Sequence, residues 1–134
     1  MSDTGHARRP TVMVCITCRA DLTATSDADA PRPGSALADA TTLAAANADN
    51  ISVLRVRCLG NCSRGLSAAI RCEHTWTYIF GGLDPQRDGP SLILGAQLLA
   101  QATDGIMPWR GRPESLKRGL IARVPPINFR EEPS

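Results

Sequence analysis

Four cysteines in two short pairs are the residues of this chain best suited to inorganic chemistry. Cys15 and Cys18 form a C-x2-C pair within VMVCITCR, and Cys58 and Cys62 form a C-x3-C pair within VRCLGNCSRG. Thiolates are soft and strongly donating, so two such pairs can hold an iron–sulfur cluster or a tetrahedral zinc ion. The spacing alone leaves both centres open.

Each pair follows a run of residues that is typical of a buried strand. Thr11–Val14 precedes the first pair and Ile51–Arg57 precedes the second. Two loops that leave the same edge of a sheet can converge, so we expect the four thiolates to enclose one centre. This convergence is the prediction on which the functional hypothesis depends.

Glycines and arginines beside the cysteines suit a negatively charged centre. Gly60 and Gly65 tolerate positive φ and allow backbone N–H groups to approach sulfur, because glycine has no Cβ. Arg19 and Arg64 can offset charge or contact a partner protein, and ordinary solvation of both side chains is the open alternative.

The fifth cysteine and both histidines are not expected to bind metal. Cys72 ends the segment SAAIRC without a neighbouring cysteine, which favours a buried structural thiol. His6 and His74 lack a second histidine or carboxylate at ligand spacing. A third alternative for Cys15 and Cys18 is a metal-free dithiol, but no helix is predicted directly after them, as that chemistry requires.

The remaining pattern predicts helices and a hairpin. An alanine-rich helix should begin at Ser35, two strands joined at Glu73–His74 should form a hairpin, and a helix should begin near Pro90. The order strand, helix, strand, hairpin, helix predicts an α/β fold with a mixed four-stranded sheet and two helices, the order of a reduced thioredoxin fold.

The domain organisation follows from these elements. We expect a disordered N-terminus at residues 1–9, the cluster-binding domain at 10–104, and a basic, proline-rich extension at 105–134 with a short helix at Glu114–Ile121. The extension carries one acid, Glu114, among five cations between residues 105 and 123: Arg110, Arg112, Lys117, Arg118 and Arg123. These cations are either a solvated surface or a means of steering an acidic partner or phosphate.

Composition narrows the class of protein. The 134 residues contain no apolar run long enough to cross a membrane and no secretory signal, which favours a cytoplasmic protein. In a reducing compartment, five cysteines favour metal ligation over disulfides. A net charge of +2 without aromatic-interleaved basic motifs argues against nucleic-acid binding. No hydrolase triad, phosphate loop or dinucleotide fingerprint is present.

Trp76, Tyr78 and Phe80 alternate along one predicted strand and therefore share one face of the sheet. Such a row is usually core. If the helices covered the opposite face, the row would be exposed, and pairing of two subunits through the sheet would bury it.

Two resemblances add to this interpretation. VRCLGNCSRG resembles the C-L-G-x-C-x-x-G loop of thioredoxin-like [2Fe–2S] ferredoxins, and the likeness spans roughly residues 10–104. The chain is more similar to a bacterial family of predicted metal-binding proteins of unknown function, in VCxTCR, WTYIFGGL, MPWRGRPE and ARVPP. Genes of that family often lie near cobalamin-biosynthesis genes.

The ferredoxin resemblance implies that Cys15, Cys18, Cys58 and Cys62 bind one [2Fe–2S] cluster, with two thiolates on each iron. It also implies a homodimer that carries electrons to a redox partner protein and is not itself an enzyme. The first pair is spaced more tightly than is usual for these ferredoxins, and many members of the second family carry a cysteine at the position of Leu66. The alternative is a module that binds or delivers zinc or another metal, with a link to cobalamin metabolism as a candidate role.

Overall fold

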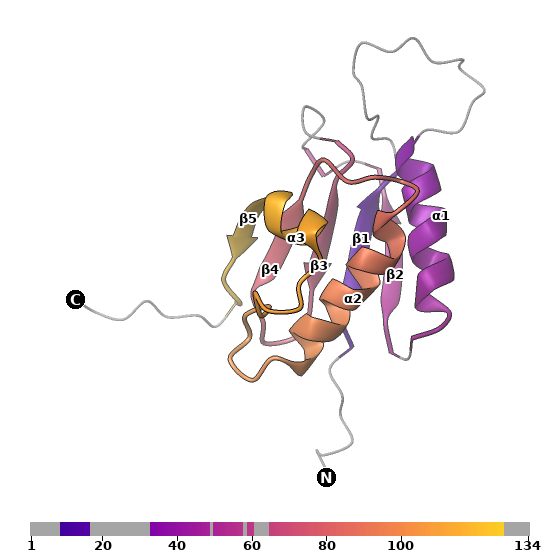
Figure 1. Ribbon diagram of the computed structural model, residues 1–134. Helices are drawn as coiled ribbons and strands as arrows, with labels where there is room; N and C mark the ends of the chain where they lie inside the picture. Colours follow the sequence, from indigo (N-terminus) through magenta and orange to yellow (C-terminus); the bar gives the residue numbers. More distant parts are fainter. Residues whose placement is uncertain (1–8, 17–32, 49, 58, 61–64, 128–134) are drawn as a thin grey trace.

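The computed structural model describes residues 9–16, 33–48, 50–57, 59–60 and 65–127. In this part of the chain, five strands form a single mixed sheet in the order β2-β1-β3-β4-β5, with three helices (Figure 1). In chain order the elements are β1 Thr11–Cys15, α1 Pro33–Ala45, β2 Ser52–Val56, β3 Ala68–Arg71, β4 Thr77–Phe80, α2 Asp88–Gln101, α3 Glu114–Arg118 and β5 Leu120–Val124.

Strand β1 lies between β2 and β3 in the sheet, and α1 makes the crossover connection from β1 to β2. It pairs in parallel with β2 on one side and antiparallel with β3 on the other, while β3 and β4 form the predicted hairpin. His74 in the hairpin turn takes a φ of 66°, and Thr75 N–H donates to the Cys72 carbonyl at 3.2 Å. The predicted order of elements is therefore confirmed.

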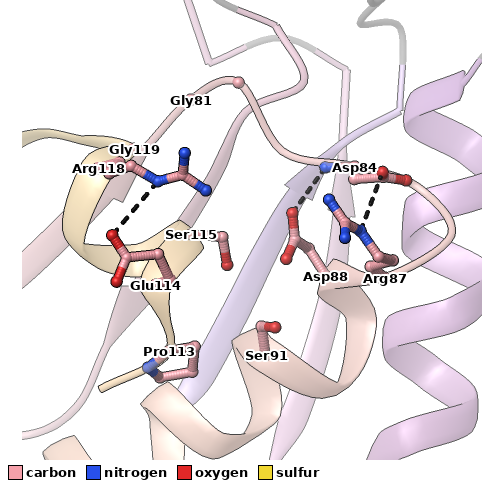
Figure 2. A pocket seen from close by; sticks show the side chains of 11 residues that line it. Gly81, Asp84, Arg87, Asp88, Ser91, Pro113, Glu114, Ser115, Arg118 and Gly119 are labelled. Carbon is pink, nitrogen blue, oxygen red and sulfur yellow. Dashed lines mark hydrogen bonds and ion pairs between the residues drawn. The ribbon is translucent and has the colours of Figure 1, made fainter.

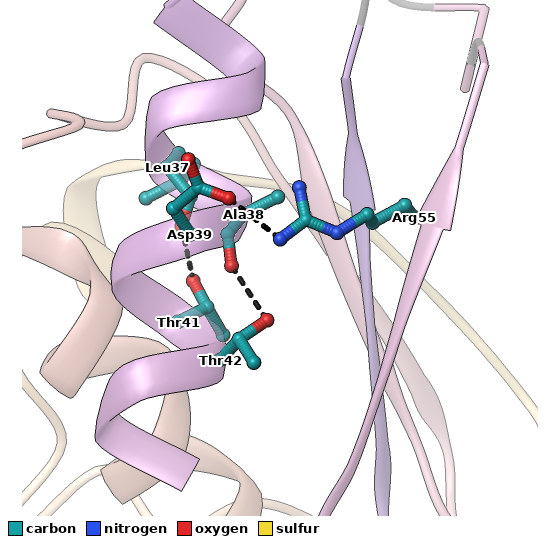
Figure 3. Close-up of polar contacts among 6 residues, drawn as sticks. All are labelled: Leu37, Ala38, Asp39, Thr41, Thr42 and Arg55. Atoms are coloured by element: carbon teal, nitrogen blue, oxygen red, sulfur yellow. Dashed lines mark hydrogen bonds and ion pairs between the residues drawn. The ribbon is translucent and has the colours of Figure 1, made fainter. Parts of the chain in front are cut away.

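Helices α1 and α2 pack against each other on one face of the sheet, α1 over β1 and β2 and α2 over β1 and β3 (Figure 1). Arg55 of β2 reaches Asp39 of α1 at 2.7 Å, which marks the side of β2 that faces the helices (Figure 3). The hydroxyls of Thr41 and Thr42 donate to carbonyls one turn earlier in α1, at 2.7 and 2.8 Å, so the buried Thr41 hydroxyl is satisfied within its own helix.

The aromatic row lies on this helix-covered face and belongs to the core. Tyr78 and Phe80 are fully buried with their rings stacked at 6.2 Å, and Trp76 packs against the same cluster. The Tyr78 hydroxyl accepts a hydrogen bond from the Met107 N–H at 2.9 Å. The helices therefore cover the same face as the aromatic row and not the opposite one. The row is not available as an interface between subunits.

The sheet has one strand more than the sequence predicted, because part of the C-terminal extension joins it. Residues Leu120–Val124 pair antiparallel with β4, with a register shift between Ile79 and Phe80. The predicted short helix ends at Arg118, earlier than expected, where Gly119 N–H donates to the Ser115 carbonyl at 2.9 Å. None of the described helices is long and apolar enough to cross a membrane.

Candidate functional site

Cys15 is the one predicted ligand that falls within the described residues. It is the last residue of β1, and 1% of its surface is exposed. Its Sγ atom lies 3.6 Å from the carbonyl oxygen of Arg57, with the geometry of a thiol hydrogen bond. Because Arg57 directly precedes Cys58 in the chain, the first cysteine lies against the backbone that leads into the second pair.

The two strands that lead to the cysteine pairs end side by side. Cys15 is in register with Val56 at the parallel ends of β1 and β2, and Ile16 N–H donates to the Val56 carbonyl at 2.8 Å. Parallel neighbours release their following loops at the same edge of a sheet, as the sequence predicted. Cys18, Cys58 and Cys62 lie outside the described residues, so the four-thiolate ligand set stays a prediction.

Leu66 and Ser67, which precede β3, lie at the same edge. Cys15 N–H donates to the Ser67 carbonyl at 3.1 Å, and the Leu66 carbonyl accepts from Leu83 N–H at 3.2 Å. The Leu66 side chain is fully buried in the hydrophobic core. Gly60 takes a φ of 74°, a conformation that glycine adopts readily, whereas Gly65 is not among the described glycines with positive φ.

A polar pocket of about 610 Å³ opens near this edge, between the β4–α2 loop, the start of α2 and α3 (Figure 2). Asp84 pairs with Arg87 and Glu114 with Arg118, each at 3.4 Å, and the buried Asp88 accepts a hydrogen bond from Asp84 N–H at 2.7 Å. The carboxylates and guanidiniums thus largely balance one another. The pocket contributes a mixed-charge surface beside the cysteine-bearing edge.

Cys72 and His74 lie at the opposite edge of the sheet, where β3 turns into β4. Cys72 is half-buried and packs against the core, so its thiol is less enclosed than predicted, and His74 is exposed. Both residues line a separate cavity with Arg9 and Arg71. Strand β3 therefore separates Cys72 from Cys15, the described candidate ligand, by the length of a strand.

Sequence reasoning missed the position of Arg112, whose charge it placed on a surface. Its side chain is buried, with Nε donating to the Pro108 carbonyl at 3.2 Å and Nη2 to the Met107 carbonyl. The guanidinium also lies 5.5 Å from the ring centroid of Tyr78. Desolvation lowers the pKa of Arg112 below its usual value, an effect that the nearby Tyr78 opposes. Arg112 therefore fixes the loop between α2 and α3.

Residues 12–126 match the family described as protein of unknown function, DUF1636. The chain belongs to the DUF1636 family. Since that description gives no function, metal binding by this DUF1636 protein remains a proposal. No curated protein matches it.

Among solved structures, the DUF1636 chain is similar to a thioredoxin-like [2Fe-2S] ferredoxin from Aquifex aeolicus. The TM-score is 0.52 at 16% sequence identity, and the likeness covers 92% of this chain and 100% of the ferredoxin chain. At this identity the likeness establishes the fold, which confirms the predicted thioredoxin-like class. The fifth strand, β5, is an addition to the four-stranded sheet that the sequence predicted.

Proposed function

We propose that this protein is a small electron carrier that holds one [2Fe–2S] cluster on Cys15, Cys18, Cys58 and Cys62. The observation that carries the proposal is the position of Cys15, buried at the end of β1 with its sulfur against the carbonyl of Arg57. That contact joins Cys15 to Arg57, the residue that directly precedes Cys58 in the chain, and so supports convergence of the two pairs. The choice of cofactor is supported by the fold, which this chain shares with a [2Fe-2S] ferredoxin.

The donor set fits the cluster chemically. Four thiolates complete the coordination of two irons, and the cluster supplies one-electron transfer when it is bound. Coordination would replace the hydrogen bond from Cys15 to Arg57, because a thiolate cannot donate. Residues of this chain would then hold and partly enclose the centre, while a redox partner protein in the cytoplasm approaches the cysteine-bearing edge.

A zinc-binding or metal-delivery module is the second candidate, and the tight C-x2-C spacing of Cys15 and Cys18 favours it. The two functions differ in what the purified protein contains. An iron–sulfur protein absorbs visible light and gives an electron paramagnetic resonance signal on reduction, whereas a zinc protein is colourless and silent.

The deciding experiment is iron, zinc and acid-labile sulfide analysis of the full chain, produced and kept without oxygen. We expect about two irons and about two sulfides per chain. Replacing Cys58 or Cys62 with serine should remove most of the cluster, whereas Cys72→Ser is the matched control that should retain it. About one zinc per chain without sulfide would establish the second candidate. A chain with neither metal nor sulfide would refute both.

A further inference from the structure

Trp109 is a large aromatic residue held rigidly at the surface. It is 61% exposed, yet two cations lie over its ring: the guanidinium carbon of Arg112 at 5.1 Å from the ring centroid and the Lys117 Nζ at 5.0 Å. Arg112 is itself fixed by the carbonyls of Met107 and Pro108. The indole therefore has a defined position although most of its surface contacts solvent.

A tight turn presents a further cation beside the indole. Arg112 N–H donates to the Trp109 carbonyl at 3.2 Å, and Gly111 takes a φ of 83°, which favours glycine. Arg110, between them, is exposed. Among the residues that the structure describes, neither Arg110 nor Lys117 has a carboxylate within salt-bridge distance, whereas Arg118 is paired with Glu114 at 3.4 Å.

A shallow cavity of about 510 Å³ adjoins this turn. Ile106, Met107 and Pro108 supply its apolar wall beside Trp109. Of the described residues that line it, one is acidic, and the carboxylate of this Asp104 accepts a hydrogen bond from the Ile106 N–H at 3.1 Å. An apolar depression thus lies next to the indole of Trp109. Beside it are Arg110 and Lys117, which pair with no carboxylate in the described part of the chain.

We propose that this surface, made of Ile106, Pro108, Trp109, Arg110 and Lys117, docks an acidic segment of a partner protein. Tryptophan and arginine are the residue types that most often dominate the free energy of protein association, and an indole that is already ordered loses little entropy on binding. Arg110 and Lys117 select an acidic partner by charge complementarity. The proposal does not depend on the cluster and holds for any function of the cysteine-bearing edge.

A protein segment fits this surface better than a nucleic acid or a membrane. Nucleic-acid surfaces combine a strongly basic domain with several stacking aromatics, whereas this chain has a net charge of +2 and one exposed indole in the surface. The patch is formed by a turn and a five-residue helix and offers no amphipathic helix that could lie in a bilayer interface.

The test is fluorescence anisotropy with the full chain and a labelled oligo-glutamate peptide that carries a central leucine. We expect saturable binding that weakens as sodium chloride is raised. Trp109→Ala and Arg110→Glu should each weaken it about ten-fold. Arg71→Glu makes the same charge change on an exposed residue of β3 that alternates to the sheet face opposite the helices, and it should alter the affinity less than about two-fold.

Labelled oligo-thymidylate is the competing probe. Absence of oligo-glutamate binding would overturn the proposal, as would equal weakening by Arg71→Glu and Arg110→Glu, since only net charge would then matter. Tighter binding of oligo-thymidylate that depends on Trp109 would assign the surface to nucleic acid instead. Trp109→Ala also removes two cation contacts, so thermal unfolding of each variant is measured. If Trp109→Ala does not fold, the test of the proposal rests on Arg110→Glu, which disturbs no described contact.

Discussion

At the scale of single residues, Arg112 determines the conformation of the loop between α2 and α3. Its guanidinium donates to the carbonyls of Met107 and Pro108 and lies over the rings of Tyr78 and Trp109. Burial lowers the pKa of Arg112, but the side chain stays cationic at neutral pH because guanidinium titrates so far above it. The buried guanidinium stabilises the loop because the carbonyls of Met107 and Pro108 accept its hydrogen bonds.

Replacing Arg112 should therefore destabilise the whole domain. In Arg112→Met one buried and one partly buried carbonyl lose their donors, and we expect the free energy of unfolding to fall by about 2–4 kcal/mol. Arg112→Lys keeps the charge but not the planar fork, and should lose about 1–2 kcal/mol. Urea unfolding measures both, with the exposed neighbour Arg110→Met as control at less than about 0.5 kcal/mol. Equal values for the Arg112 and Arg110 variants would contradict this role.

The sequence predicted some residues correctly because their environment is local. Cys15 stands at the end of β1 as expected, since a run of apolar residues before a polar loop is readable over a few positions. Arg112 was not predictable in this way, because its burial depends on Tyr78, which lies far from it in the chain. The positions of Cys18, Cys58 and Cys62 stay predictions, since they lie outside the described residues.

At the scale of elements, the contact between α1 and α2 depends on a glycine. A Cβ on Gly89, in the first turn of α2, would lie 2.7 Å from the backbone carbon of Ala40 in α1. Backbone atoms of a packed helix cannot move aside as a side-chain terminus can. The helices can therefore approach this closely only while residue 89 lacks a side chain.

Gly89→Ala should separate the two helices and destabilise the fold. Overpacking costs about 1–3 kcal/mol, and the gain in helix propensity is small in the first turn, so we expect a net loss of about 2 kcal/mol. Chemical denaturation followed by far-ultraviolet circular dichroism gives the value. Gln101→Ala, at the exposed last residue of the same helix, should change stability by less than about 0.5 kcal/mol. A neutral or stabilising Gly89→Ala would show that α1 shifts freely.

Local sequence patterns predicted most of the elements but not β5. Both long helices, the hairpin and the first two strands carry local signals of period and capping, and each was predicted within a few residues. Strand β5 was missed because Leu120–Val124 is short, contains an arginine and is followed by two prolines. Residues Leu120–Val124 form a strand because they pair with the edge strand β4, and no pattern within the extension indicates that partner.

At the scale of the whole molecule, the sheet has two unlike faces. The helix-covered face is closed, whereas the alternation of side chains places Met13, Leu54, Val56, Ile79 and Val124 on the other face. Leu54 and Val124 are each 47% exposed, and the other three are partly exposed. None of the described helices covers this face, so its apolar side chains form a surface from β2 to β5, with Thr11, Thr77 and the exposed cation Arg71 at its hairpin end.

We propose that a second copy of the chain covers this open face and forms the predicted homodimer. A two-fold axis through the sheet would place the same apolar side chains against each other, which removes them from water without an unpaired charge at the centre. The proposed interface lies on the face opposite to the aromatic row of Trp76, Tyr78 and Phe80, which packs in the core.

A cation placed within the open face tests the dimer. Leu54→Arg would put a guanidinium among the apolar side chains of each subunit, and we expect the dissociation constant to rise at least about ten-fold. Leu43→Arg is the matched control, because Leu43 is 72% exposed on the outer side of α1 and should leave the constant within about two-fold. Sedimentation velocity over a range of micromolar concentrations measures both. A wild-type chain that sediments as a monomer throughout would exclude the dimer, and equal effects of the two arginines would assign the interface to another surface.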